Sequence, residues 1–141
     1  MSRRASVTDS MAQIPMFTAC TKRELQAIER LTTQQSVPAG KTLTQEGDGG
    51  SEFAIILEGT AVATRNGREI GRLGPGDYYG EIALLDPGVR TATVTAESPM
   101  TLAVLTPAEF SEALAEVPAL AQKILRGLAR RVHELSAEDH V

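Results

Sequence analysis

Residues 73–96 read LGPGDYYGEIALLDPGVRTATVTA, and this stretch decides how the rest of the chain is interpreted. A glycine-rich turn leads into residues 81–85, which follow Gly80 and have the composition of one short helix. The sequence Asp86-Pro87-Gly88 ends that helix. Residues 91–96 then alternate polar and small apolar side chains, as a half-buried strand does. The pattern predicts a short helix inserted between two β-strands.

The start of this short helix is suited to binding an anion. Backbone N–H groups after Gly80 have no partner within the helix, and the helix dipole adds positive potential there. Arg90, at the end of the loop, can place its guanidinium group on the same anion. Glu81 would repel a bare phosphate, so the ligand must also offer a hydrogen-bond donor such as a sugar hydroxyl. These residues together indicate a small phosphorylated sugar and not an extended polyanion.

The flanking sequence predicts strands on both sides of this segment. Asn66-Gly67 is typical of a two-residue hairpin turn of type I′. Short strands that are joined by such turns, with no helices between them, favour an antiparallel barrel or sandwich. The expected strands cover residues 34–37, 41–44, 52–58, 60–65, 68–73, 92–96 and 100–106.

Helices are expected at both ends of the strand region. Thr21 and Glu24 form a capping box in front of a helix over about residues 22–31. Thr106 and Glu109 form a second capping box, with a proline at the first helical position. A last helix starts near Pro118. The predicted fold is therefore mainly β: an antiparallel β-barrel (jelly roll) with one N-terminal helix, the short helix after Gly80 and two C-terminal helices.

The last predicted helix carries a wide apolar stripe. Its members recur every three or four residues, which places them on one helix face. They are Leu120, Ile124, Leu128, Val132 and Leu135, with Ala121 and Leu125 beside them. Such a stripe can cover the barrel, and its far end could pair with a second copy of the chain.

Length and composition fit one domain. A chain of 141 residues can bury its own core and leaves little room for a second domain. Hydrophobic residues make up 42% and charged residues 23%, which argues against a disordered chain. Residues 1–15 are small and polar without clear periodicity. We therefore expect a loose tail over residues 1–15 and a single domain over residues 16–141.

Charge and cysteine content limit the possible functions. Fourteen Lys+Arg against 18 Asp+Glu give a net charge of −4, which argues against a protein that mainly coats nucleic acid. Cys20 is the only cysteine, which excludes an intramolecular disulfide and suits a reducing compartment. No run approaches the roughly 18 apolar residues of a membrane span, and no secretory signal is visible. We expect a cytoplasmic protein without a transmembrane segment.

Residues 73–85, followed by Arg90-Thr91-Ala92-Thr93-Val94, closely resemble the phosphate-binding cassette of cyclic-nucleotide-binding domains. Such domains occur in the catabolite activator protein and its relatives, in cyclic-nucleotide-gated channels, and in cAMP- and cGMP-dependent kinases. The resemblance covers roughly residues 15–136. It implies a regulatory domain that reversibly binds a cyclic purine mononucleotide, cAMP more than cGMP, and signals by moving its C-terminal helix.

The resemblance also implies a role for each cassette residue. Glu81 matches the acceptor of the ribose 2′-hydroxyl, and Arg90 matches the cation on the cyclic phosphate. Thr91 can reach the phosphate and tolerates either purine, so it does not decide between cAMP and cGMP. The remaining matched positions, whose backbone lines the pocket in the family, are Gly80, Ile82 and Ala83.

The last helix departs from the family pattern. In the catabolite activator subgroup, polar residues of this helix contact the adenine, and an alignment on residues 129–131 puts Leu135 and Ser136 there. These two residues are the candidate base contacts, although one is apolar. The chain stops at Val141 before any helix-turn-helix, so direct DNA binding is not expected. The output would instead pass to a protein partner or a second subunit, including a homodimer through the C-terminal helix.

Other interpretations of the same residues stay open. Glu81 and Arg90 could form an ordinary surface ion pair of about 0–1 kcal/mol. The chain could be an interaction or dimerisation module that binds no nucleotide, or the excised regulatory domain of a channel, transporter or transcription factor. An enzyme is not expected, because the predicted barrel has no histidine for a cupin-type metal site and no P-loop or nucleophile elbow is present. No metal and no cofactor beyond the cyclic nucleotide are predicted.

Overall fold

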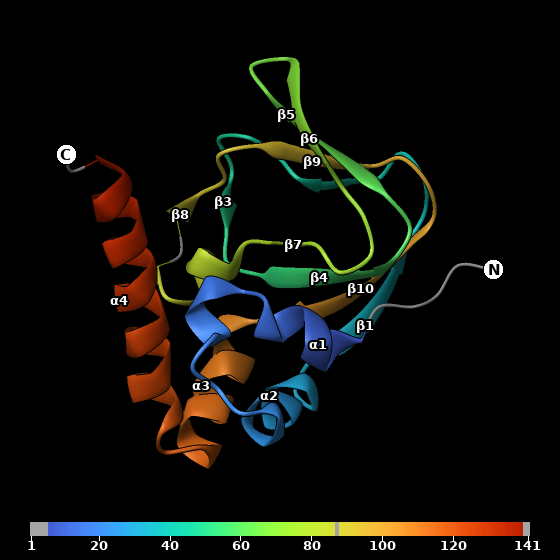
Figure 1. The fold of residues 1–141 in the computed structure, drawn as a ribbon. Helices are drawn as coiled ribbons and strands as arrows, with labels where there is room; N and C mark the ends of the chain where they lie inside the picture. The colour runs from blue at the N-terminus through green and yellow to red at the C-terminus, as the bar shows by residue number, and fades with distance from the viewer. Residues whose placement is uncertain (1–5, 87, 140–141) are drawn as a thin grey trace.

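The computed structural model describes residues 6–86 and 88–139, with side chains described as far as Leu135 in the last helix. Two antiparallel sheets form the centre of the molecule, and helices α1, α2 and α3 gather under one of them while α4 runs along one side (Figure 1). The helical elements are α1 (Val7–Ala12), η1 (Pro15–Phe17), α2 (Lys22–Glu29), η2 (Glu81–Leu84), α3 (Pro107–Glu116) and α4 (Leu120–Asp139).

Each of the two large sheets has four strands. The first sheet has the order β1-β10-β4-β7, with bounds Thr33–Val37, Met100–Leu105, Phe53–Glu58 and Tyr78–Tyr79. The second sheet has the order β2-β9-β5-β6, with bounds Thr42–Thr44, Thr93–Ala96, Ala61–Arg65 and Arg68–Leu73. A small pair joins β3 (Gly49–Gly50) to β8 (Gly88–Val89).

Strand β4 organises the core because both of its faces are covered. Residues 53–57 are all buried, as the continuous apolar sequence of the strand requires. Successive side chains of a strand point to opposite faces. Phe53, Ile55 and Leu57 accordingly pack with the helices, whereas Ala54 and Ile56 pack against the second sheet. The sheet that carries β4 therefore separates two apolar layers.

The predicted fold class is confirmed, with one difference in the sheets. Both capping boxes form, with the Glu24 N–H donating to Thr21 Oγ1 at 3.2 Å and the Glu109 N–H donating to Thr106 Oγ1 at 3.2 Å. Within the described part of the chain, no strand pairing joins the two large sheets, so they face each other as an open pair and not as a closed barrel. The expected short helix is a 3₁₀ helix, η2, that ends at Leu84.

The expected loose tail is wrong for residues 6–15. Helix α1 covers Val7–Ala12, and Met11 and Ile14 have no exposed surface. Thr8 Oγ1 donates a hydrogen bond of 2.6 Å to Glu29 Oε2 of α2, which ties this segment to the domain. Apolar residues at positions 7, 11 and 14 follow helical spacing, so a signal was present. Residues 1–5 lie outside the described residues.

Helix α4 is anchored at its start and exposed towards its end. Leu120 and Ile124 are buried, and Lys123 Nζ forms an ion pair of 2.6 Å with Glu24 Oε1 of α2. Gly127 lies against η1, where an added Cβ would come within 2.6 Å of the Pro15 carbonyl oxygen. Val132 is 61% exposed. The predicted apolar stripe therefore covers the core along only its first half.

Candidate functional site

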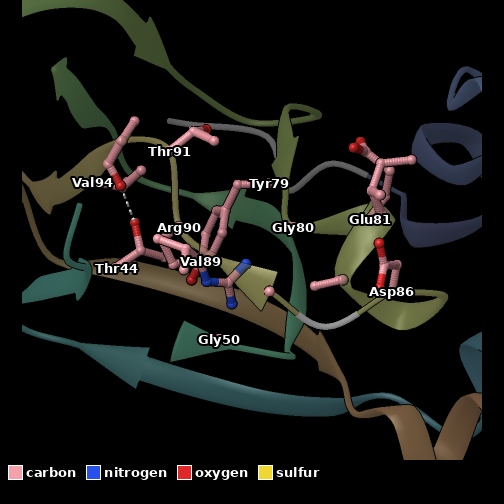
Figure 2. A pocket seen from close by; sticks show the side chains of 14 residues that line it. Thr44, Gly50, Tyr79, Gly80, Glu81, Asp86, Val89, Arg90, Thr91 and Val94 are labelled. Carbon is pink, nitrogen blue, oxygen red and sulfur yellow. Dashed lines mark hydrogen bonds between the residues drawn. The ribbon is translucent and has the colours of Figure 1, made fainter. Parts of the chain in front are cut away.

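A cavity of about 360 Å³ opens between the η2 turn and the loop that carries Arg90 (Figure 2). Strands β2, β3, β7, β8 and β9 contribute to its walls. The structure brings six predicted ligand residues to this one cavity: Gly80, Glu81, Ile82, Ala83, Arg90 and Thr91. The other lining residues are Thr44, Gly50, Tyr79, Asp86, Gly88, Val89, Ala92 and Val94.

Gly80 occupies the turn between β7 and η2, and its conformation requires glycine. Its φ of +81° lies in the left-handed region, where a side chain is strained. An added Cβ would also lie 2.6 Å from Arg90 Nη1 and in contact with the Glu52 carbonyl oxygen. Within η2, the Ala83 N–H donates to the Gly80 carbonyl at 3.1 Å. That N–H, which we expected to face the phosphate, is therefore engaged within the turn.

Arg90 is held by backbone atoms beside the Gly80 turn. Its Nη2 donates to the Glu52 carbonyl at 2.8 Å, and its own N–H donates to the Asp48 carbonyl at 2.8 Å. The guanidinium carbon lies 6.0 Å from the centre of the Tyr79 ring, a distance at which a cation is attracted by the ring face. The guanidinium group is thus fixed without a carboxylate partner among the described residues.

Glu81 and Arg90 do not pair with each other. Figure 2 shows the Glu81 carboxylate and the Arg90 guanidinium pointing apart, from two different sides of the cavity. Burial raises the pKa of the Glu81 carboxyl, and the Ile82 backbone N–H offsets part of that rise. The alternative of an ordinary surface ion pair is therefore wrong for these two residues. Both charges remain available for groups of a ligand.

A model of the family described as "Cyclic nucleotide-binding domain" matches residues 34–117, which include η2, Arg90 and both sheets. The chain belongs to this family. The resemblance that we drew from residues 73–94 is thereby confirmed.

Individual relatives agree with this assignment. The chain is 37% identical over 98 residues to a cAMP-dependent protein kinase regulatory subunit of Mycosarcoma maydis, which covers 67% of this chain and 19% of that protein. It is 34% identical over 113 residues to a cyclic nucleotide-gated potassium channel of Mesorhizobium japonicum, which covers 79% of this chain and 31% of the channel. The chain therefore spans less than a third of the length of either relative.

Solved structures extend the similarity to the whole fold. The N-terminal domain of a transcriptional regulator from Streptomyces coelicolor A3(2) superposes with a TM-score of 0.82 at 30% identity, covering 92% of this chain and 94% of that one. The catabolite activator protein of Thermus thermophilus superposes with a TM-score of 0.70 at 28% identity, covering 89% of this chain and 61% of that one. The open pair of sheets with flanking helices is therefore the fold of this family.

Among the lining residues of this cyclic nucleotide-binding domain that sequence reasoning missed, Thr44, Tyr79 and Gly50 contact the segment around Arg90. Thr44 is buried and donates from Oγ1 to the Ala92 carbonyl at 2.9 Å, which fixes β2 to the strand behind Arg90. Tyr79 lies beneath the guanidinium group, and burial raises the pKa of its hydroxyl to about 12. Gly50 faces the Arg90 side chain. Tyr79 lay inside the stretch that we singled out, whereas nothing local marked Thr44 or Gly50.

Thr91 and the candidate base contacts differ in where the structure places them. Thr91 lines the cavity but is exposed, and its carbonyl accepts from Arg65 Nε at 2.8 Å. Leu135 is 44% exposed on α4 and does not line the cavity. The side chain of Ser136 lies outside the described residues. A contact of either residue with a base stays a prediction that requires α4 to move.

The described residues contain neither a metal site nor a membrane-spanning helix. No group of three His, Cys, Asp or Glu side chains is placed so that it could hold a metal ion. None of the described helices combines the length and the apolar character of a membrane span.

Proposed function

We propose that this domain reversibly binds a cyclic purine mononucleotide, with cAMP preferred over cGMP, and acts as a regulator and not as an enzyme. One observation carries the proposal: a half-buried carboxylate and a backbone-held guanidinium face a single cavity and do not neutralise each other. A cyclic phosphate would satisfy Arg90, and the ribose 2′-hydroxyl would donate to Glu81. The preference for cAMP is supported by the similarity to a cAMP-dependent protein kinase regulatory subunit.

A thermal shift experiment with cAMP, cGMP and AMP tests this proposal. A ligand at a hundredfold over its dissociation constant adds about 2.7 kcal/mol to the free energy of unfolding. For a domain of this size, that raises the melting temperature by roughly 5–10 °C. We expect a shift with cAMP, a smaller shift with cGMP at the same concentration, and none with AMP. No shift with either cyclic nucleotide at millimolar concentration would leave the interaction module as the better account.

Under the same proposal, helix α4 transmits the effect of ligand binding to a partner. Its first half is fixed by buried Leu120 and Ile124 and by the Lys123–Glu24 ion pair, whereas Leu125, Val132 and Leu135 are exposed. Movement of the distal half over the bound base would change how these apolar side chains are presented. The binding of a protein partner or of a second copy of the chain would then depend on how these side chains are exposed. A ligand can shift such an equilibrium only by its difference in affinity for the two arrangements.

The wider context of the domain belongs to the proposal as well. The curated relatives are several times longer than the match. We therefore propose that the domain regulates either a separate partner or a larger polypeptide of which it is a part. A cytoplasmic location is proposed because Cys20 is a free thiol.

A further inference from the structure

The guanidinium group of Arg90 lies in a narrow slot that is built from its neighbours. The Glu52 carbonyl accepts from Nη2 at 2.8 Å, and the Tyr79 ring centre lies 6.0 Å from the guanidinium carbon. The backbone of Gly80 closes a third side near Nη1. Figure 2 shows the fourth side, where the guanidinium group points towards β3, the strand of Gly50.

Gly50 leaves the space that this side chain fills. A Cβ added at residue 50 would lie 2.6 Å from Arg90 Cζ and 2.9 Å from Cδ, and it would also collide with Nε. The backbone φ of Gly50 is negative, outside the left-handed region. The backbone of residue 50 would therefore accept alanine. Space for Arg90, and not backbone conformation, is what requires glycine here.

The preceding residue provides the contrast. Gly49 belongs to the same two-residue strand β3 and pairs with Val89, as Gly50 pairs with Gly88. An added Cβ at Gly49 would meet nothing within 4 Å. Gly49 also has no positive φ, and it does not line the cavity beside η2, although it borders a neighbouring cavity to which Arg90 and Gly50 also contribute. Two adjacent glycines with similar strand geometry thus differ in whether a methyl group would displace the guanidinium group.

We propose that Gly50 is a positioning residue for ligand binding. Because Gly50 has no side chain, the Arg90 guanidinium group can occupy the slot from which it would bind the phosphate. The inference rests on the proposed function of the cavity and goes beyond it by assigning to Gly50 a role that acts through the Arg90 side chain. A guanidinium group that is already confined loses less side-chain freedom when the phosphate arrives. The atoms that an alanine would strike belong to the flexible end of the Arg90 side chain, so the side chain would turn away while the β3–β8 pairing persists.

The decisive comparison is between Gly50→Ala and Gly49→Ala. We expect Gly50→Ala to weaken cAMP binding about ten- to a hundredfold, which corresponds to the loss of charge-assisted hydrogen bonds. We expect Gly49→Ala to bind like the unaltered protein, and both ligand-free variants to keep its melting temperature. Unchanged affinity in Gly50→Ala overturns the proposal. A large drop in the ligand-free melting temperature of Gly50→Ala also overturns it, because the glycine would then serve the fold.

A double-variant cycle shows whether Gly50 acts through Arg90. In an Arg90→Leu background no guanidinium group remains to be displaced, so adding Gly50→Ala should change the affinity by less than about twofold. An equal loss in both backgrounds would mean that residue 50 affects the ligand directly, and the positioning role would be wrong.

The slot is also tested without any ligand. Arg90 Cδ lies close enough to Gly50 for a nuclear Overhauser effect between the Arg90 δ protons and the Gly50 α protons. We expect this signal in the unaltered protein and in Gly49→Ala. If the unaltered protein lacks this nuclear Overhauser effect, the Arg90 side chain does not lie against Gly50 and the proposal is wrong. If the unaltered protein binds no cyclic nucleotide yet shows the signal, the proposed function fails while the position of Arg90 stands.

Discussion

The side chains of Glu81 and Arg90 carry opposite charges and line one cavity, but each is stabilised by a different neighbour. The guanidinium group is held by the Glu52 carbonyl, whereas the carboxylate is partly desolvated and, among the residues that the structure describes, is stabilised by the Ile82 N–H of its own turn. A group in this position is disfavoured in its charged form until a donor reaches it. The ligand that we propose, which carries an anion and a hydroxyl at a short separation, would satisfy both groups.

The raised pKa of Glu81 predicts a pH dependence of stability in the ligand-free domain. Because the folded pKa lies above the unfolded one, the folded state binds more protons between these two values, so stability falls as pH rises through that window. Glu81→Gln removes this dependence. We expect the variant to be at least as stable as the unaltered protein at neutral pH, and the difference in melting temperature to shrink as pH is lowered towards the ordinary range of Glu.

Thermal melts of both ligand-free proteins across about pH 4.5 to pH 7.5 measure that difference. A difference that stays constant, or that favours the unaltered protein more strongly at neutral pH, would contradict the burial of this carboxylate. The same variant should bind cAMP more weakly at neutral pH, since an amide is a poorer acceptor for the ribose hydroxyl than a carboxylate.

At the scale of elements, the sequence predicted features that depend on neighbouring residues, but not contacts between residues that are far apart in the chain. The two capping boxes placed the starts of α2 and α3 because their hydrogen bonds span only three residues. Helix α1 was missed because it is only six residues long, too short for its apolar spacing to stand out, and it is held by packing of Val7 and Met11 in the core. Gly50 and Thr44 were missed for a related reason. Their partners in the cavity lie about forty or more residues away, at Arg90 and Ala92.

The burial of α1 predicts that the N-terminal segment is part of the domain. Met11 has no exposed surface, so Met11→Ala should lower the free energy of unfolding by about 2–5 kcal/mol. Gln13→Ala, an exposed position in the same segment, should change it by less than about 0.5 kcal/mol. Urea unfolding of both variants gives the comparison. Equal stabilities would mean that the segment is a loose tail after all.

At the scale of the whole molecule, the sheet that carries β4 connects the cavity to the helices. Strand β4 packs the helices on one face and the second sheet on the other, and β7, which precedes η2, pairs with it directly. The strand-rich character of the chain and the hairpin between β5 and β6 could be predicted from the sequence, because turns and alternation are local. The lack of pairing between the two large sheets could not, because strand patterns do not say which strands end at a sheet edge.

The proposed role of the molecule depends most directly on the phosphate contact of Arg90. Titration calorimetry with cAMP on the unaltered domain, Arg90→Leu and Arg68→Leu measures that contact, with the exposed Arg68 of β6 as a charge-matched control. Removing one partner of a desolvated charge pair costs about 2–5 kcal/mol, so Arg90→Leu should bind about thirty-fold to a few thousand-fold more weakly. Arg68→Leu should bind like the unaltered domain. Equal affinity in all three proteins would contradict the account of this cavity as a cyclic nucleotide site.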